Sequence, residues 1–176
     1  MRNDRKEFEI LAPAGSREAM AAAATAGADA VYFGLGALDM RSLATGAFGE
    51  ADLPEIAAFA KEHDLKTRLT VNAVLYDEDL AAARQTMFAA KKAGIDAVIC
   101  SDVAAMMLAH EVGIPVHLST QLNIANVEAL KFYARFADVA VLARELTLEQ
   151  TGAITRAIDE QNICGSSNID KICRVC

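Results

Sequence analysis

Polar side chains follow two apolar runs of the sequence, at the point where each run ends. Val116–Leu118 indicates a short buried strand, which leads into four hydrogen-bonding residues, Ser119, Thr120, Gln121 and Asn123. Val139–Ala143 indicates another strand, which leads into Arg144 and Glu145. In parallel α/β folds the carboxyl ends of the strands face the active site. We therefore expect the chemistry of this protein at these strand ends.

Amide and hydroxyl groups at these positions can recognise a polar ligand. Asn72, near the end of a third apolar run, and Asn126 carry the same kind of group. These side chains can bind substrate because they both donate and accept hydrogen bonds. They can equally cap helices, and Asn126 directly precedes an expected helix at Val127–Phe136. Ligand binding and helix capping are both open for these side chains. The uncharged candidate substrate-binding residues are Asn72, Ser119, Thr120, Gln121 and Asn123.

Arg41 and Arg144 are the candidate anion-binding residues. Arg41 lies on the loop after an expected strand at Ala30–Gly34, and Arg144 directly follows a strand. A guanidinium is a fixed cation with a planar set of donors that suits a carboxylate or a phosphate. The alternatives are ion pairs within the protein, between Arg41 and Asp39 or a helix, and between Arg144 and Glu145.

Glu145 and Asp102 are the candidate acid–base residues. Glu145 could take a proton or orient Arg144. Asp102 ends the apolar run AVICSD, so it is either a carboxylate at the active edge or the N-cap of a helix at Val103–His110. We expect Thr147 to cap the helix that starts at Leu148, because Gln150 lies three residues after it, as in a capping box.

The sequence shows no recognisable hydrolytic centre. Neither GxSxG nor HExxH occurs. His117 and Ser119 are two residues apart and therefore share a strand face. Because no acid is evident to orient the histidine, we do not expect a self-contained Ser–His hydrolase. No metal-binding residues are assigned.

The elements that would position these residues repeat along the chain. An apolar run, a polar loop and a stretch with helical periodicity recur, which is typical of βαβ units. The expected strands are Glu9–Ala12, Ala30–Gly34, Lys66–Val74, Ala97–Ser101, Val116–Ser119 and Val139–Ala143. Ser16 and Gly27 have the types that begin and end a helix at Arg17–Ala26, and Gly94 and Gly113 end later helices. AGADAV and AGIDAV repeat one helix-to-strand joint, so Asp29 and Asp96 are taken as structural.

This pattern predicts an α/β fold, an incomplete TIM-barrel-like (β/α) domain of about six units. Strands this apolar must be covered on both faces, which favours a parallel sheet. A doubly wound sheet is less favoured, because LAPAGS has one glycine where a dinucleotide fingerprint needs three. A complete barrel takes about 250 residues. We therefore expect a partial barrel at residues 1–161, a divergent tail at 162–176, and open sheet edges that need a partner chain or a second copy.

Composition indicates a cytoplasmic protein with no membrane span. The chain is 53% hydrophobic and 23% charged, and its longest apolar runs are short of the ~18 residues that cross a bilayer. The net charge of −7 argues against a large general surface for nucleic acid. A local basic groove stays compatible with this charge.

Five motifs resemble the N-terminal part of the collagenase-like peptidases of family U32. They are LAPAGSREAMAAAATAGADAVYFG, MRSLATGAF, LTVNAVLYDEDL, HLSTQLNIANVEALKFY and VLARELTLEQ, and the resemblance runs from about Glu9 to about Ala157. It implies a TIM-barrel-like fold. Members are named collagenase-like proteases, and relatives act in hydroxylation of transfer RNA, ribosomal RNA or ubiquinone. Several relatives hold an iron–sulfur cluster through cysteines that follow this region.

The tail departs from the family pattern. Cys164, Cys173 and Cys176 are close together, but their spacing matches no common zinc or iron–sulfur site, and the CxxYSGRC type of motif is missing. We therefore expect no cluster from this chain alone, although a full-length parent could hold one. We expect this tail to be a truncated or non-native end.

The leading hypothesis is the substrate-facing part of a U32 enzyme that hydroxylates an RNA base, such as uridine in transfer RNA. The first alternative is a peptidase, as the family name implies, so the substrate is RNA or a peptide. The second is a non-catalytic binding fragment that needs a partner chain.

Overall fold

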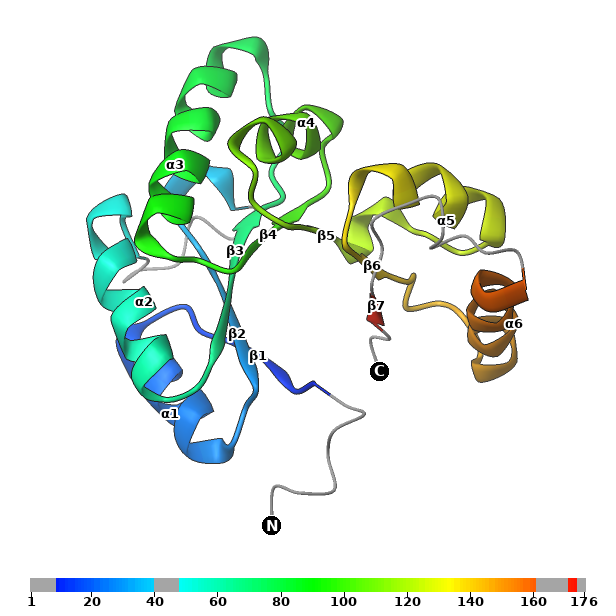
Figure 1. Ribbon diagram of the computed structural model, residues 1–176, viewed down its shortest axis with the longest axis horizontal. Helices are drawn as coiled ribbons and strands as arrows, with labels where there is room; N and C mark the ends of the chain where they lie inside the picture. Colours follow the sequence, from blue (N-terminus) through cyan, green and yellow to red (C-terminus); the bar gives the residue numbers. More distant parts are fainter. Residues whose placement is uncertain (1–8, 40–47, 161–170, 174–176) are drawn as a thin grey trace.

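The computed structural model describes residues 9–39, 48–160 and 171–173. Its seven strands form one parallel sheet in sequence order (Figure 1). The strands are β1 (Leu11–Pro13), β2 (Ala30–Gly34), β3 (Lys66–Val71), β4 (Ala97–Cys100), β5 (Val116–Leu118), β6 (Val139–Val141) and β7 (Lys171–Cys173). The helices are α1 (Arg17–Ala26), α2 (Leu53–Glu62), α3 (Leu80–Ala93), α4 (Val103–Val112), α5 (Val127–Tyr133) and α6 (Leu148–Glu160).

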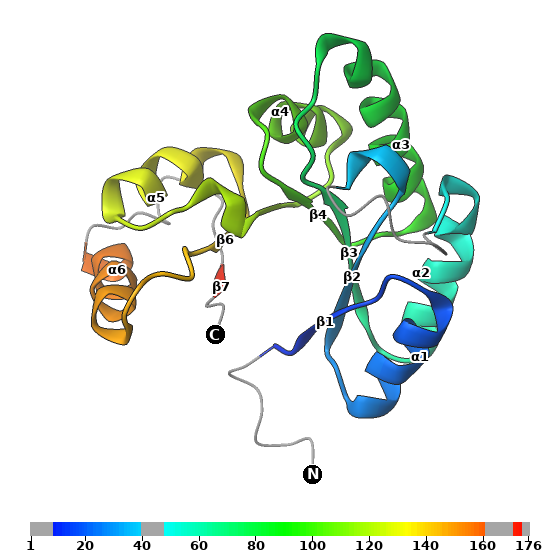
Figure 2. The ribbon, with the colours of Figure 1, turned by 180° about the vertical axis from the view of Figure 1, so that it is seen from behind.

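The sheet curls into an open half-barrel with its helices on the outside. Figures 1 and 2 show α1 to α6 around the convex face, with β1 and β7 at the two ends of the strand order. This confirms the predicted TIM-barrel-like α/β fold. The strand β7 was not predicted; it pairs in parallel with β6 within the segment assigned to the tail. β3 and β6 end earlier than predicted, at Val71 and Val141.

Local signals in the sequence set most helix ends. The Ser16 side chain accepts a hydrogen bond from the Ala19 N–H, 3.2 Å away, and so caps α1. Gly27, Gly94 and Gly113 end three helices in the left-handed conformation, with φ of 82°, 94° and 73°. Glycine adopts this conformation at little cost, which explains why these helices end there.

The hydrophobic core lies between the sheet and its helices. Outward-facing strand residues such as Val31, Leu69, Val98, Val116 and Leu118 are fully buried. Each such side chain stabilises the fold by about 1.5–3 kcal/mol. Alternate residues face the concave side, where Tyr32, Ile99, His117, Val139 and Val141 are half-buried. Cover on the concave side is uneven, because Ala30, Arg68, Thr70 and Ala97 are buried on the same face.

Aspartates at the helix-to-strand joints connect neighbouring strands. The Asp29 carboxylate accepts the Ile10 N–H at 2.8 Å, and the Asp138 carboxylate accepts the Val116 N–H at 2.8 Å. Asp96 accepts both the N–H and the hydroxyl of Thr67 at 2.7 Å. The structural assignment of Asp29 and Asp96 is confirmed. FADVAV contains the same joint, with Asp138 in place of these residues.

None of the described helices has the length and the apolar composition needed to cross a membrane.

Candidate functional site

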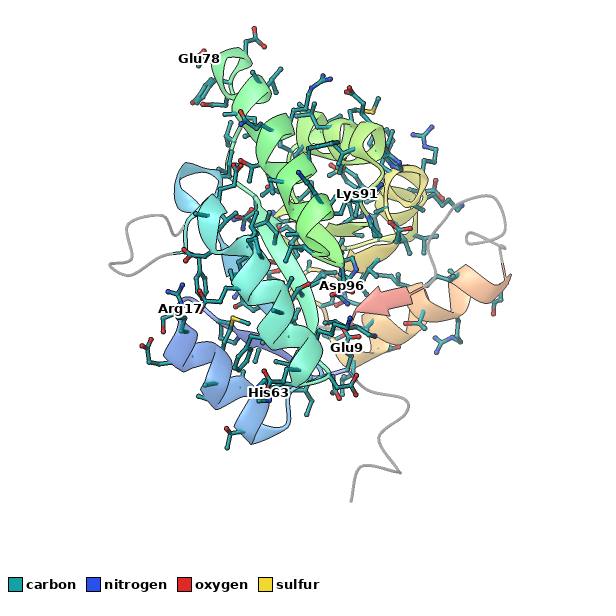
Figure 3. The ribbon with its side chains drawn as sticks, turned by 60° about the vertical axis from the view of Figure 1, so that its left-hand side comes forward. Glu9, Arg17, His63, Glu78, Lys91 and Asp96 are labelled. Carbon is teal, nitrogen blue, oxygen red and sulfur yellow. The ribbon has the colours of Figure 1, made fainter. Side chains whose placement is uncertain are left out.

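The predicted site residues come from loops at one end of the sheet. Asn72 follows β3, Asp102 follows β4, Ser119 follows β5, and Arg144 and Glu145 follow β6. Because these strands are parallel, their carboxyl ends share one edge. Figure 3 shows Glu78, on the loop after β3, far from Glu9 and Asp96 at the opposite end. Arg41 lies outside the described residues.

Hydrogen bonds link these loops to one another. The Ser101 hydroxyl donates to the Asn72 carbonyl oxygen at 2.9 Å. The Ser119 N–H donates to the Cys100 carbonyl oxygen at 2.8 Å, and the Ala143 N–H donates to the Ile124 carbonyl oxygen at 3.0 Å. The loops after β3, β4, β5 and β6 are therefore held side by side, which fixes the relative positions of the polar groups that they carry.

Asp102 is the N-cap of α4. One carboxylate oxygen accepts the Ala104 N–H at 2.7 Å, and the other lies 3.5 Å from the Leu75 nitrogen. The capping interpretation is confirmed. Both carboxylate oxygens therefore have backbone partners, one of them on the loop after β3. An acid–base role for Asp102 stays a prediction.

Ser119 begins a short 3₁₀ helix, Thr120–Leu122. Ser119 is 6% exposed, and its hydroxyl oxygen accepts the Gln121 N–H at 3.3 Å. Asn123 follows in the left-handed conformation, with φ of 49°, and its side chain is exposed, as is that of Gln121. In this loop Gln121 and Asn123 are thus the amides that solvent reaches, while Ser119 stabilises the turn.

Arg144 and Glu145 form an exposed turn before α6. The capping box next to them is confirmed: the Thr147 N–H donates to Gln150 at 2.8 Å, and the Gln150 N–H donates to Thr147 at 3.2 Å. Asn126 is likewise the N-cap of α5, accepting the Ala129 N–H at 2.9 Å. No Arg144–Glu145 ion pair occurs in the described part of the chain. Both charged groups lie where a ligand could reach them.

The sequence analysis missed Arg68, whose side chain faces the concave side and is buried. Its Nη2 lies 3.5 Å from Glu9 Oε1, and its Nη1 donates to the Thr67 carbonyl oxygen at 3.1 Å. Arg68 belongs to the amino-terminal half of β3, away from the polar loops. The feature of the sequence that could have identified Arg68 is a charged residue in the middle of the strand KTRLTV.

The described residues do not form a metal or cluster site. Cys100 is buried, and burial together with the nearby Asp102 raises the pKa of its thiol to about 12. A ligand thiol must be deprotonated, so this environment opposes metal binding. Within residues 9–39 and 48–160 no group of three or more His, Cys, Asp or Glu could hold a metal ion. Cys164 and Cys176 lie outside the described residues.

The family follows from a match over most of the chain. The model of peptidase family U32 matches residues 15–164. The chain belongs to this family. The U32 resemblance based on the five motifs is thereby confirmed.

Relatives with different names match the same region. A collagenase of Porphyromonas gingivalis is 55% identical over 159 residues, covering 90% of this chain and 38% of the relative. A 23S rRNA 5-hydroxycytidine synthase of Escherichia coli is 35% identical, covering 86% and 23%. The tRNA hydroxylation protein P1 of Bacillus subtilis is 31% identical, covering 88% and 37%. The chain thus spans less than two fifths of these relatives.

Solved structures agree on the fold. The U32 peptidase Mk0906 aligns with a TM-score of 0.69 at 18% identity, covering 85% of this chain and 64% of that one. A putative copper homeostasis protein CutC of Streptococcus agalactiae aligns with a TM-score of 0.63 at 10% identity, covering 95% and 98%. Likeness at this identity supports the barrel-like architecture only.

Proposed function

We propose that this chain forms the substrate-facing part of a U32 enzyme that hydroxylates an RNA base. The observation that carries the proposal is the row of polar loops at the carboxyl edge of β3 to β6. These loops present the exposed amides of Gln121 and Asn123 next to an exposed arginine and glutamate. Relatives named for rRNA and tRNA hydroxylation match the segment that builds this edge.

In this proposal the residues bind and orient the nucleotide. Amides can read the hydrogen-bonding edge of an unstacked base, and Arg144 can bind the phosphate or stack on the base. Glu145 would orient Arg144 or accept a proton. Hydroxylation is a two-electron oxidation that also needs an oxygen donor. We assign no residue of this chain to the oxidation itself.

The charge of the chain limits how it can bind RNA. With a net charge of −7, long-range attraction to the phosphate backbone is weak. Recognition by this chain would therefore depend on contacts to one or two exposed nucleotides, as for single-stranded loops.

Deletion and complementation test the proposal. We expect cells that lack the gene to lose 5-hydroxyuridine from transfer RNA or 5-hydroxycytidine from ribosomal RNA, as measured by mass spectrometry of nucleosides. The wild-type gene should restore the modification, whereas Arg144→Ala should lower it at least tenfold. Arg156→Ala, on the body of α6, is the matched control and should restore it fully. Unchanged modification in the deletion strain would rule the proposal out.

A peptidase function is the second candidate, because the relative with 55% identity is named a collagenase. The described residues give it less support, since Ser119 is buried as a residue and its hydroxyl oxygen accepts the Gln121 N–H. Cleavage of collagen peptides that is lost in Ser119→Ala but kept in Thr25→Ala, on the exposed side of α1, would favour this function over base hydroxylation.

A further inference from the structure

The loop after β2 turns back over the end of its own strand. Gly36 has a φ of 50° and begins the 3₁₀ turn Gly36–Leu38. The Asp39 N–H donates to the Gly36 carbonyl oxygen at 3.3 Å. Glycine adopts a positive φ at little cost, so this residue permits the turn. The turn brings the side chain of Asp39 back to Gly34, the last residue of β2.

Gly34 leaves room for the Asp39 side chain. A Cβ atom on residue 34 would lie 2.5 Å from both the Cβ and the Cγ of Asp39, which is closer than such atoms approach in proteins. Gly34 pairs with Thr70 and alternates with the buried Phe33, so a side chain at this position would point to the concave side. The half-buried Asp39 therefore places its carboxylate on the concave side, at the carboxyl end of the strands.

Asp39 belongs to the same row of loops as the candidate substrate-binding residues. The Ala73 N–H donates to the Leu38 carbonyl oxygen at 3.2 Å, which joins the loop after β2 to the loop after β3. The hydrogen bond between Ser101 and Asn72 continues this connection to the loop after β4. The connected loops at the carboxyl edge thus extend from β2 to β6, and Asp39 is a carboxylate that they direct inward.

The residues next to Asp39 in this layer contribute little polarity. The Thr70 hydroxyl donates to the Phe33 carbonyl oxygen at 2.9 Å, so its proton is already used. Ile99, which pairs with Thr70, is apolar. A ligand group that reaches this layer meets an apolar surface with a carboxylate beside it. Such a surface suits a flat ring with an N–H on one edge, whereas a carboxylate repels a phosphate.

We propose that Asp39 binds the Watson–Crick edge of the pyrimidine that the enzyme hydroxylates, an inference that rests on the proposed function. The carboxylate accepts the N3–H of uracil or the N4 amino group of cytosine. The ring then lies inside the half-barrel, while the phosphate stays outside with the exposed Arg144. C5 of the pyrimidine lies on another edge of the ring and remains accessible. Asp39 thereby selects the base and orients it.

Gly34→Ala tests the placement of Asp39 without a ligand. We expect this change to lower the Tm of the wild-type chain by about 3 °C or more, measured by circular dichroism, because the new Cβ overlaps Asp39. In the Asp39→Gly chain the same change should leave the Tm nearly unchanged, because the overlapping side chain is gone. An equal fall in both chains would overturn the placement and, with it, the proposal.

Nucleoside binding to the chain tests the role of the carboxylate. Ligand-observed NMR gives the Kd values of uridine, 3-methyluridine, cytidine and N4,N4-dimethylcytidine. We expect the wild type to bind one natural pyrimidine at least tenfold more tightly than its methylated analogue, because the methyl groups remove the N–H. Asp39→Ala should abolish this preference. Asp77→Asn, on the exposed loop after β3, is the matched control and should keep it. A preference for uridine identifies N3–H as the donor, and a preference for cytidine identifies the N4 amino group.

Three results would overturn the inference: no measurable binding of either natural nucleoside, no preference over the methylated analogues, or a preference that Asp39→Ala retains. The proposed function has a separate test, since it fails when the deletion strain keeps its hydroxylated nucleosides. A preference that depends on Asp39, combined with unchanged modification, would support pyrimidine binding at Asp39 and reject base hydroxylation.

Discussion

Asp102 shows how one side chain can fit two interpretations of the sequence. Its carboxylate caps α4 through Ala104 and approaches the Leu75 nitrogen on the neighbouring loop. A cap of this kind is worth about 0.5–2 kcal/mol. The same position, at the carboxyl edge of a parallel sheet, is where a catalytic acid would lie. Stability measurements can separate these roles, because asparagine caps a helix as well as aspartate does but cannot transfer a proton.

We expect Asp102→Ala to lower the free energy of unfolding by about 1 kcal/mol and Asp102→Asn to leave it nearly unchanged. Urea unfolding followed by circular dichroism measures both. If Asp102→Asn also keeps the activity of the enzyme, the acid–base assignment is wrong. If this variant loses activity at full stability, the carboxylate has a chemical role besides capping.

At the scale of elements, the repeated aspartate joints hold the strands at the amino end of the sheet. Each carboxylate joins the start of one strand to the strand before it, across one helix. The repetition in the sequence revealed the joint, whereas the pairing partner of each aspartate is visible only in the structure. The Asp96 carboxylate accepts two hydrogen bonds from Thr67, whereas the Asp29 carboxylate accepts one from the Ile10 N–H.

This difference predicts an order of stability. Hydrogen bonds to charged groups contribute about 1.5–3 kcal/mol each, so Asp96→Ala should destabilise the fold more than Asp29→Ala. Differential scanning calorimetry of both variants checks the order, with Glu78→Ala on the exposed loop after β3 as the control, expected within about 0.5 kcal/mol of wild type. Equal effects of the two aspartate variants would show that Thr67 contributes nothing through its second bond.

At the scale of the whole molecule, one hydrophobic core extends along the convex side of the sheet. Cys100 lies inside it, on the central strand β4, and is fully buried. Burial raises the pKa of its thiol to about 12, so the thiol stays protonated at neutral pH. Modification of Cys100 therefore requires opening of the core, and Cys100 can report on the stability of the whole fold.

In a variant with serine at Cys164, Cys173 and Cys176, we expect Cys100 to react with a thiol reagent at least a thousandfold more slowly than in urea. The rate should follow the population of the unfolded state, so destabilising Asp96→Ala should accelerate it. The folded-state thiol stays protonated at pH 9, because its pKa is raised to about 12. A thiol in the unfolded chain ionises between pH 7 and pH 9, so raising the pH should speed the reaction of the unfolded chain. Rapid labelling under native conditions would show that β4 opens locally.

The sequence by itself determined the parallel α/β architecture, the helix caps and the family. These features depend on local signals: the periodicity of apolar residues, the side chain before each helix and the glycine after it. The six strands from β1 to β6 were found for this reason, and so were Asn126 and the Thr147–Gln150 box. The polar candidates at the carboxyl ends were placed on one edge because parallel strands share their direction.

The tertiary structure decided the features that join distant parts of the chain. Arg68 and Glu9 are 59 positions apart, and no local pattern shows that they meet on the concave face. Local patterns also do not show the hydrogen bond between Ser101 and Asn72, which links two loops, or the pairing of β7 with β6. Such contacts depend on how far the sheet curls and on which strands remain at its edges. These properties arise from packing the whole chain, so periodicity and capping residues do not specify them.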